Sequence, residues 1–196
     1  MEVVLIRHGF SVGNQKNTLS GWTDVPLTQE GIQELIELKN KNIYPETERV
    51  FSSDLSRAYD TAKILYPDHE IVKLPAFREI NFGIYENMNA YEINFKDFFE
   101  DWINGQVVEE GENYFQFRQR VLQGFCDLST WMTREKVNHY TLVSHAGVIK
   151  VLLMALLQKP PKSYFEMEVS NGLGYYLHLN LADSSMKLLN FNGISV

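Results

Sequence analysis

Short apolar runs alternate along the chain with longer segments in which apolar residues recur at every third or fourth position. The runs at 3–6, 50–52 and 140–144 are short and continuous, which is typical of strands buried on both faces of a sheet. The segments with helical spacing predict helices at about 28–38, 55–65, 91–102, 114–132 and 148–157. Thr28 stands where an N-cap residue of the first helix is expected.

The remaining patterns complete an alternating order of strands and helices. Further strands are predicted at 70–74 and, as a closing pair around the Asp183-Ser184 turn, at 175–181 and 187–191. This order favours the α/β class, a three-layer α/β/α sandwich with a mainly parallel sheet. Because no linker, repeat or low-complexity tract interrupts it, we expect a single domain over residues 1–196, with a helical cap-like insertion at about 84–112.

The composition is that of an ordinary folded protein and argues against some classes of partner. Of 196 residues, 44% are hydrophobic and 22% are charged, which supports one core and excludes a disordered chain. The net charge is −7, whereas proteins that bind nucleic acid or an anionic membrane are normally basic. Without a signal peptide or a run of about 18 apolar residues, we expect a cytoplasmic protein. The single cysteine, Cys126, excludes an internal disulfide and is predicted to be a small buried thiol.

Two histidines follow directly after predicted buried strands. The strand at 3–6 leads into Arg7 and His8, and the strand at 140–144 leads into His145. Ligands of parallel α/β sheets bind beyond the carboxyl ends of the strands. We therefore expect these three side chains to meet in one crevice.

The helix after the second buried strand adds a further cation. Ser53 or Asp54 is expected to cap this helix, which brings Arg57 in its first turn to the same edge of the sheet. Guanidinium groups, histidines and a helix N-terminus all favour an anion, and a guanidinium matches two phosphate oxygens at once. Each residue alone also has a structural explanation, such as a turn at Asn14 or a solvated charge at Glu79. Only their coincidence at one edge favours a functional anion site.

Four blocks of sequence, in order, resemble a known family. They are Leu5-Ile6-Arg7-His8-Gly9 with Ser11, Asn14, 20–24 and 27–31, then 52–58 with Thr61-Ala62, then 78–83, and finally 143–148. Together they resemble the signature of the histidine phosphatase superfamily, the phosphoglycerate-mutase-like group named for its Arg-His-Gly tripeptide. The resemblance spans residues 3–155, which is most of the chain.

The resemblance implies a role for each matched position. His8 would be the nucleophile that accepts the phosphoryl group, and Glu79 would be the general acid that protonates the leaving oxygen. The implied phosphate- and substrate-binding positions are Arg7, Arg57 and His145 for the oxygens, Asn14 in support, Ser20 and Gly21 on the substrate side, and the backbone amide of Ala146. The resemblance implies no cofactor and no metal.

The chemistry explains these residue types on its own terms. Phosphoryl transfer calls mostly for positioning and for positive charge around the equatorial oxygens, which two arginines and a protonated His145 would supply. A histidine is nucleophilic only when neutral, and the neighbouring arginines should lower the pKa of His8. The donor, Glu79, must hold its proton near neutral pH through burial or the bound phosphate dianion.

The spacing of the blocks favours the phosphatase branch of the family over the mutase branch. Mutases carry a long basic insertion between the acid block and the last histidine, whereas only 66 positions separate Glu79 from His145. The segment 109–114 leading into 117–121 is similar to α-ribazole phosphatases and small broad-specificity phosphatases. We therefore expect a metal-independent phosphomonoester hydrolase that acts on a small phosphorylated metabolite, with α-ribazole 5′-phosphate as one possibility.

Two sets of residues near the expected pocket mouth bear on the substrate. Phe10 after Arg-His-Gly and Tyr85-Glu86-Asn87 after the acid block depart from the family pattern. The aromatic residues either wall a pocket for an apolar leaving group or pack in the core and cap, and we favour packing; they are Phe10, Trp22, Tyr85, Tyr91, Phe95 and Phe98.

Three other functions compete with this interpretation. Phosphoglycerate mutase activity and a catalytically silent phosphoester-binding protein both fit the same fold. A zinc hydrolase could use two histidines and one glutamate, but no close His pair occurs and two arginines would repel the cation. Nucleic-acid and membrane partners are not expected, and the sequence leaves monomer and homodimer open.

Overall fold

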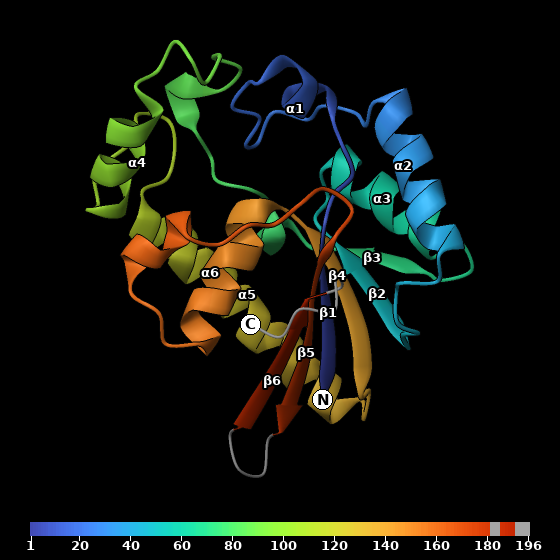
Figure 1. Cartoon of the computed structure of the whole chain (residues 1–196). Coiled ribbons are helices and arrows are strands. Elements are labelled where there is room, and N and C mark those ends of the chain that lie inside the picture. The colour runs from blue at the N-terminus through green and yellow to red at the C-terminus, as the bar shows by residue number, and fades with distance from the viewer. Residues whose placement is uncertain (181–184, 191–196) are drawn as a thin grey trace.

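The computed structural model describes residues 1–180 and 185–190 and is built on one sheet with the strand order β3-β2-β4-β1-β5-β6 (Figure 1). The strands are β1 (Glu2–Arg7), β2 (Arg49–Ser52), β3 (Ile71–Lys73), β4 (His139–Ser144), β5 (Gly174–Asn180) and β6 (Ser185–Asn190). β1, β4, β2 and β3 pair in parallel, whereas β5 runs antiparallel to β1 and β6 antiparallel to β5. The predicted mainly parallel sheet is confirmed.

Helices cover both faces of this sheet. They are α1 (Val12–Lys16), α2 (Gln29–Asn40), α3 (Ser56–Leu65), α4 (Phe95–Ile103), α5 (Tyr114–Arg134) and α6 (Ala146–Leu156), with 3₁₀ turns at Pro75–Phe77, Gly83–Tyr85 and Pro161–Phe165. Figure 1 shows α2 and α3 on one side of the strands and α5 and α6 on the other, which confirms the three-layer sandwich. None of the described helices is long and apolar enough to cross a bilayer.

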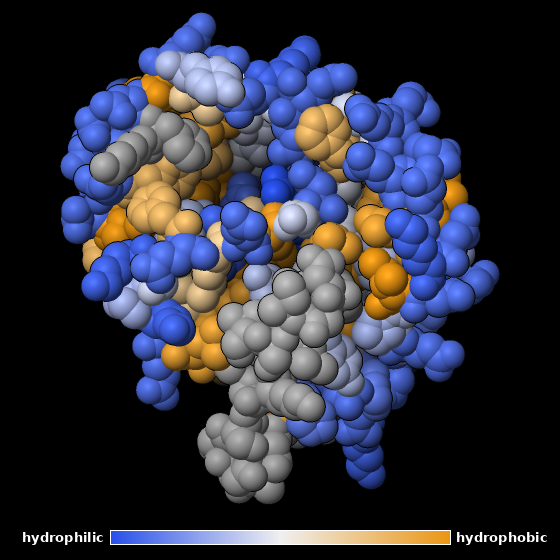
Figure 2. Space-filling view, in the orientation of Figure 1, coloured by the Kyte–Doolittle hydropathy of each residue, from blue (hydrophilic) through white to orange (hydrophobic). Residues whose placement is uncertain are grey.

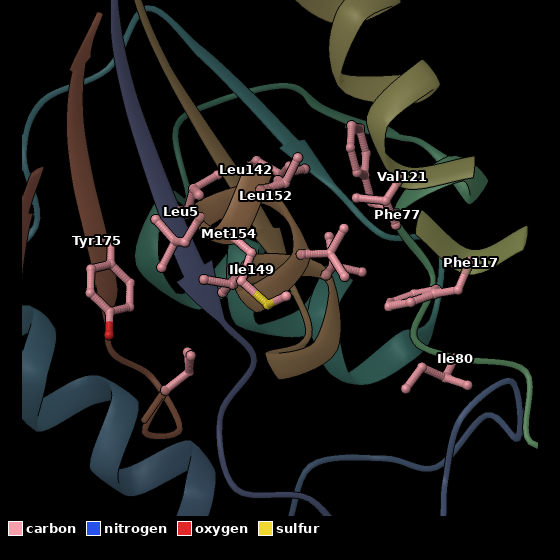
Figure 3. Close-up of a cluster of buried hydrophobic side chains, with 14 of the residues drawn as sticks. Leu5, Phe77, Ile80, Phe117, Val121, Leu142, Ile149, Leu152, Met154 and Tyr175 are labelled. Carbon is pink, nitrogen blue, oxygen red and sulfur yellow. The ribbon is translucent and has the colours of Figure 1, made fainter. Parts of the chain in front are cut away.

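The alternation of side chains along β1 produces the two halves of the core. Val3 and Leu5 belong to a cluster that includes residues of α5 and α6, and Figure 3 shows Leu5 close to Ile149 and Leu152 in it. Val4 and Ile6 point the other way, into a second cluster that includes residues of α2 and α3. A strand with both faces buried in this way is why its sequence reads as a continuous apolar run.

The register of β1 and β4 brings the two predicted histidines together. Arg7 is the partner of Ser144, so His8 and His145 each follow one member of the last pair. The His8 amide donates to the Ser144 carbonyl at 2.9 Å. Residues 137 positions apart in sequence thus become neighbours at the carboxyl edge of the sheet.

Residues 84–112 form the most irregular part of the described chain. The predicted helix at 91–102 is α4, which begins only at Phe95, because the segment before it is in turns and the Tyr91 amide donates to the Asn89 side chain at 2.9 Å. Trp102 near the end of α4 is 1% exposed and packs on Tyr114 with ring centroids 5.3 Å apart. The segment is therefore attached to the body of the protein through an aromatic contact with α5.

The predicted cap of α3 is wrong. Asp24 accepts from the Ser56 amide at 2.8 Å and from the Ser56 hydroxyl at 2.7 Å. Asp54 is unable to serve because both its oxygens are taken by the Arg78 guanidinium, at 2.8 and 2.6 Å. Ser53 accepts only from the Leu55 amide, one residue ahead of the helix.

Two other expectations have clear outcomes. Thr28 caps α2, since its hydroxyl accepts from the Gly31 amide at 2.9 Å. The prediction that Cys126 is buried is wrong: its side chain is exposed, because the buried stripe of α5 runs through Val121 and Leu128 and bypasses it. The expected turn at Asp183-Ser184 lies outside the described residues.

Candidate active site

A cavity of about 280 Å³ opens at the carboxyl ends of β1 and β4, beside the start of α6. Figure 2 shows a hollow in this face with a hydrophilic floor and a hydrophobic wall on the side of α4. The predicted site residues that line the cavity are Arg7, His8, Asn14, Ser20, Arg57, Glu79 and Ala146. Of the predicted set, Gly21 and His145 are not among the lining residues.

His8 has one ring nitrogen fixed by the backbone. Nδ1 lies 2.7 Å from the Gly9 carbonyl oxygen, which can only accept, so Nδ1 carries the hydrogen. Burial, reinforced by the charges of Arg57 and Arg7, holds the pKa of His8 well below its usual range. The ring is therefore neutral, and its Nε2 has a free lone pair at the cavity.

His145 lies directly behind His8, with ring centroids 5.2 Å apart. It is 0% exposed, and neither of its ring nitrogens has a hydrogen-bond partner among the described residues. Burial first, then the charges of Arg57 and Arg7, hold the pKa of His145 well below its usual range. Without an anion, a further cation beside two guanidinium groups is costly, so the protonated His145 expected during phosphoryl transfer stays a prediction for the state with a bound anion.

The two arginines are held by backbone carbonyls rather than by carboxylates. Arg57 is 1% exposed and donates to the carbonyls of Thr23 at 3.0 Å, Ser20 at 2.7 Å and Gly21 at 2.8 Å. Arg7 donates through Nη1 to the Val169 carbonyl at 2.6 Å, and its buried Nε has no partner among the described residues. Neither guanidinium forms an ion pair within the described part of the chain, so both keep charge available for a ligand.

Glu79 lines the same cavity as His8. Its carboxylate accepts from the Ile80 amide and the Gly147 amide, both at 3.1 Å. A Cβ at position 147 would lie 2.2 Å from Oε1 of Glu79, so a larger residue there would displace the Glu79 carboxylate. The third residue of the His145-Ala146-Gly147 block thus makes room for the carboxylate of the acid block.

The smaller predicted positions fall into two groups. The Asn14 side-chain oxygen accepts from Ser11 and Asn171, which leaves its NH₂ group to face a ligand. Ser20 lines the cavity, and its carbonyl and that of Gly21 hold Arg57. Gly21 is needed for close approach, since a Cβ there would lie 1.8 Å from the Ile80 carbonyl oxygen.

Sequence reasoning missed two residues of the site. Lys150 lines the cavity with its ammonium 4.8 Å from the Tyr164 ring centroid, and burial lowers the pKa of Lys150. The signal was present, since Lys150 is the only charged residue within the apolar helix α6. Asn171 donates to the His8 carbonyl at 2.9 Å, and no local pattern marks it.

The apolar wall of the cavity comes from aromatic residues other than those considered. Phe82, Phe99 and Phe165 line it, whereas Trp22, Tyr85 and Phe98 do not. Phe98 packs on Tyr85 with ring centroids 5.0 Å apart, in line with the favoured packing role.

The departure at Glu86 also has a structural explanation. Its carboxylate accepts from the amides of Trp22 at 2.8 Å and Thr23 at 3.0 Å, next to the carbonyls that hold Arg57.

Among the described residues no group of three or more His, Cys, Asp or Glu side chains could hold a metal ion.

Comparisons with known proteins agree with this geometry. The family model described as "Histidine phosphatase superfamily (branch 1)" matches residues 3–192. The chain is 26% identical over 204 residues to the adenosylcobalamin/alpha-ribazole phosphatase of Escherichia coli, covering 100% of this chain and 98% of that protein. It superposes on the alpha-ribazole phosphatase of Shigella flexneri with a TM-score of 0.82 at 27% identity, over 100% and 99% of the two chains.

A further solved structure, the phosphoserine phosphatase of Entamoeba histolytica in complex with 3-phosphoglyceric acid, matches with a TM-score of 0.80 at 25% identity. The match covers 95% of this chain and 94% of the phosphoserine phosphatase chain.

Proposed function

The chain belongs to the histidine phosphatase superfamily, and we propose that it hydrolyses small phosphomonoesters through a phosphohistidine formed on His8. Family membership makes it a phosphatase that acts on small phosphorylated substrates, and the roles of individual residues are our proposal. The proposal places one domain over residues 1–196, in which the segment 84–112 is a cap beside the cavity.

The observation that carries the proposal is the fixed, neutral state of His8. Its Nδ1 hydrogen is committed to the Gly9 carbonyl, so only Nε2 can attack a phosphorus atom. Burial and two guanidinium groups keep the pKa of His8 low and therefore keep this nitrogen unprotonated. A histidine placed for structural reasons alone would need neither feature.

In the first step, Nε2 of His8 attacks phosphorus and the bond from phosphorus to the ester oxygen breaks. The leaving oxygen takes the proton carried by Glu79 and departs as an alcohol. Arg7 and Arg57 stabilise the equatorial oxygens, because their charges are not paired with carboxylates. The products of this step are a phosphorylated His8 and the free alcohol.

In the second step, water attacks the phosphohistidine from the side that the alcohol has left. The Glu79 carboxylate accepts a proton from this water while the nitrogen–phosphorus bond breaks. Inorganic phosphate is released, and Glu79 again holds the proton needed for the next cycle.

His145 becomes a phosphate ligand only when the anion is present. A dianion opposes the effect of the two arginines and raises the pKa of this ring. A ring nitrogen that has no partner among the described residues then gains both a proton and an acceptor. The NH₂ group of Asn14 and the backbone amide of Ala146 at the start of α6 complete the set of donors.

Hydrolysis is favoured over phosphoglycerate mutase activity by what the cap contributes. Within 84–112, the residues that line the cavity are Ala90 and Phe99, neither of which is basic. A mutase must hold a second phosphate or a phosphorylated donor, which calls for cations from this region. The cap wall fits a less polar leaving group.

The relatives suggest which ester to test first. Two of the named relatives are alpha-ribazole phosphatases that this chain matches over nearly its full length. We therefore propose α-ribazole 5′-phosphate as the leading candidate substrate, with phosphoserine and 3-phosphoglycerate as alternatives.

A substrate panel tests the function. Release of inorganic phosphate is measured for α-ribazole 5′-phosphate, phosphoserine, sugar phosphates and nucleotides, with phosphoglycerate interconversion followed in parallel. The proposal predicts net phosphate release. Binding of phosphoesters with no turnover would identify a silent binding protein, and interconversion without net release would identify a mutase.

Glu79→Gln tests the proton donor. An aryl oxygen leaves without a proton, whereas an alkyl oxygen needs one to leave. We therefore predict a loss of about 100-fold or more in kcat on alkyl phosphates and a much smaller loss on p-nitrophenyl phosphate. Glu109→Gln, an exposed change of the same kind, is the control and should leave both rates unchanged. Equal losses on the two substrates would show that Glu79 is not the donor.

A further inference from the structure

The acid-block segment that carries Glu79 is held by a partly buried ion pair from another part of the chain, Arg120 with Glu112. We infer that Arg120 and Glu112 are positioning residues for the proton donor and set the reach of the Glu79 carboxyl toward the leaving oxygen. The inference rests on the proposed role of Glu79. It assigns a function to the sequence motif at 109–121, and the fold alone does not require this motif.

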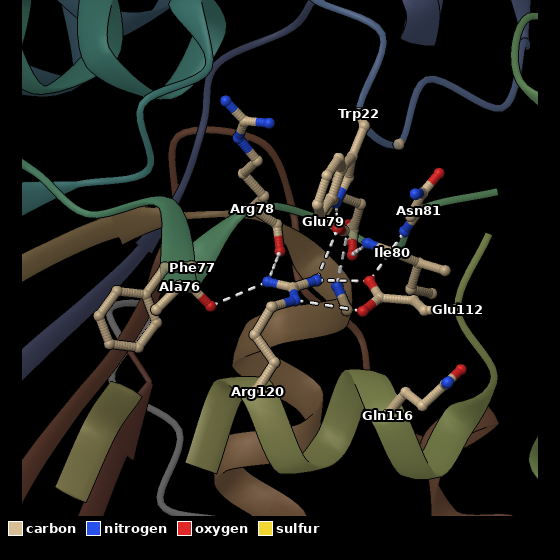
Figure 4. A network of polar contacts seen from close by, with 12 residues as sticks. Trp22, Ala76, Phe77, Arg78, Glu79, Ile80, Asn81, Glu112, Gln116 and Arg120 are labelled. Carbon is tan, nitrogen blue, oxygen red and sulfur yellow. Dashed lines mark hydrogen bonds and ion pairs between the residues drawn. The ribbon is translucent and has the colours of Figure 1, made fainter. Parts of the chain in front are cut away.

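Arg120 donates to three backbone carbonyls within residues 76–79. Its guanidinium reaches the carbonyls of Ala76 at 2.9 Å, Arg78 at 3.0 Å and Glu79 at 3.0 Å (Figure 4). An arginine has five donors in a rigid fork, so this set fixes the segment in both position and direction. A lysine in the same place could not satisfy all of these acceptors.

Glu112 completes the arrangement from the other end of the segment. It accepts from Arg120 through both oxygens, at 2.5 and 3.1 Å, and from the Asn81 amide at 2.9 Å. The pair therefore binds the carbonyl of Glu79 and the amide two residues later. With side chains only 20% and 12% exposed, Arg120 and Glu112 form this pair largely away from water, where hydrogen bonds to charged groups are strong.

Trp22 contributes a second donor to the same backbone position. Its Nε1 donates to the Glu79 carbonyl at 2.9 Å, and the Arg120 guanidinium lies 5.7 Å from its ring centroid. The main chain of Glu79 is thus held on one side while its carboxylate is held by the amides of Ile80 and Gly147 on the other. Figure 4 shows Arg120 rising from α5 toward this segment, with Trp22 opposite.

The start of α5 sets the position of the pair. Asn113 caps the helix in a reciprocal arrangement with Gln116, so the helix begins at Tyr114, two residues after Glu112. The Glu112 carbonyl also accepts from the Trp102 ring nitrogen at 2.9 Å, which ties the end of the 84–112 segment to the same point. Arg120 lies two turns into the helix on the face that meets the acid segment.

The consequence is chemical because proton transfer depends steeply on distance. A displacement of about 1 Å in a catalytic group can lower the rate by about 100-fold. Loss of the Arg120 contacts frees the backbone at Glu79 and should impair proton donation selectively, while attack by His8 is unaffected. The selectivity separates positioning from general loss of structure.

The test compares Arg120→Lys and Glu112→Gln with the unaltered enzyme on an alkyl phosphate and on p-nitrophenyl phosphate. We expect kcat on the alkyl ester to fall about 10- to 100-fold more than kcat on the aryl ester, with KM changed little. The ratio of the two rates does not depend on the fraction of folded enzyme, so a loss of stability cannot produce it. Arg118→Lys, an exposed change on the same helix, is the control.

Combination with Glu79→Gln makes the outcome decisive. If Arg120 acts through Glu79, the double variant Arg120→Lys/Glu79→Gln should be no slower on the alkyl ester than Glu79→Gln alone. Equal losses on both esters, or additive losses in the double variant, would overturn the inference. If Glu79→Gln itself shows no selectivity between the esters, the proposed donor is wrong and the failure lies there instead.

Discussion

His8 and His145 owe their neutral state to where they are buried. Each ring is almost without contact with solvent, and each lies within the field of Arg7 and Arg57. Their folded pKa values are therefore lower than the unfolded value of about 6.5. In the proposed mechanism, the neutral His8 ring is ready for attack, and the His145 ring gains its proton when the anion binds.

The same shift predicts how stability depends on pH. As the pH falls below about 6.5, the two histidines become protonated in the unfolded chain but stay neutral in the folded protein. The free energy of unfolding therefore decreases by about 1.4 kcal/mol per pH unit for each histidine. The contribution is complete above that pH and is lost as the pH falls toward the folded pKa values. Urea unfolding between about pH 5 and pH 7.5 should show a shallower dependence in His145→Gln than in the unaltered protein. Parallel slopes would contradict the assigned state of His145.

At the level of single residues, the sequence identifies what stands next to a recognisable motif. Arg7, His8, Glu79 and Arg57 were all predicted, and all line the cavity. Lys150 was missed because its position follows from the pitch of α6 rather than from a motif.

At the scale of elements, the start of α3 determines where Arg57 sits. Arg57 is the second residue of the helix, and the first is held by Asp24 from a distant loop. Capping groups contribute by satisfying amides that have no partner within the helix. Asp24 therefore positions the start of α3 and, with it, the Arg57 guanidinium.

Asp24→Ala should lower the free energy of unfolding by about 1–2 kcal/mol, because the Ser56 amide and hydroxyl lose their acceptor. Asp24→Asn keeps an acceptor oxygen and should lose much less, and Asp68→Ala, on the exposed surface, should lose almost nothing. Chemical unfolding measures all three. Equal losses in Asp24→Ala and Asp24→Asn would mean that charge, rather than capping, is the contribution of Asp24.

Elements with strong periodicity were predicted well, and their ends less so. The buried strands and α5 lie within a few residues of the predicted positions. The predicted cap of α3 was wrong because the capping side chain, Asp24, comes from a loop far away in sequence, and local patterns carry no information about such a partner. The start of α4 was placed at 91 rather than at Phe95 because a turn, in which the Tyr91 amide donates to the Asn89 side chain, precedes the helix.

At the scale of the whole molecule, the site is assembled from segments far apart in sequence. The sheet register places His8 beside His145. Their proximity was predicted from the rule that ligands bind at the carboxyl ends of parallel strands. The contacts of Arg120 with Glu79 and of Asn171 with His8 join residues 41 and 163 positions apart. They depend on how layers pack, which hydrophobic periodicity does not determine.

The charge of the whole chain and the charge of the site have opposite signs. The chain carries a net −7, yet Arg7, Arg57 and Lys150 all line one cavity whose lining includes a single carboxylate, that of Glu79. The acidic surplus lies outside this cavity. Net charge therefore argues against large polyanionic partners without describing the ligand of the site.

The most direct test of the account is to trap the phosphoenzyme. The protein is mixed with a ³²P-labelled phosphomonoester, quenched in alkaline detergent, digested and mapped by mass spectrometry. The account predicts label on the peptide that contains His8, removal of the label by mild acid, its absence from His8→Ala, and its retention in His139→Ala, an exposed control. An acid-stable label, label on another residue, or substantial turnover by His8→Ala would contradict the central claim.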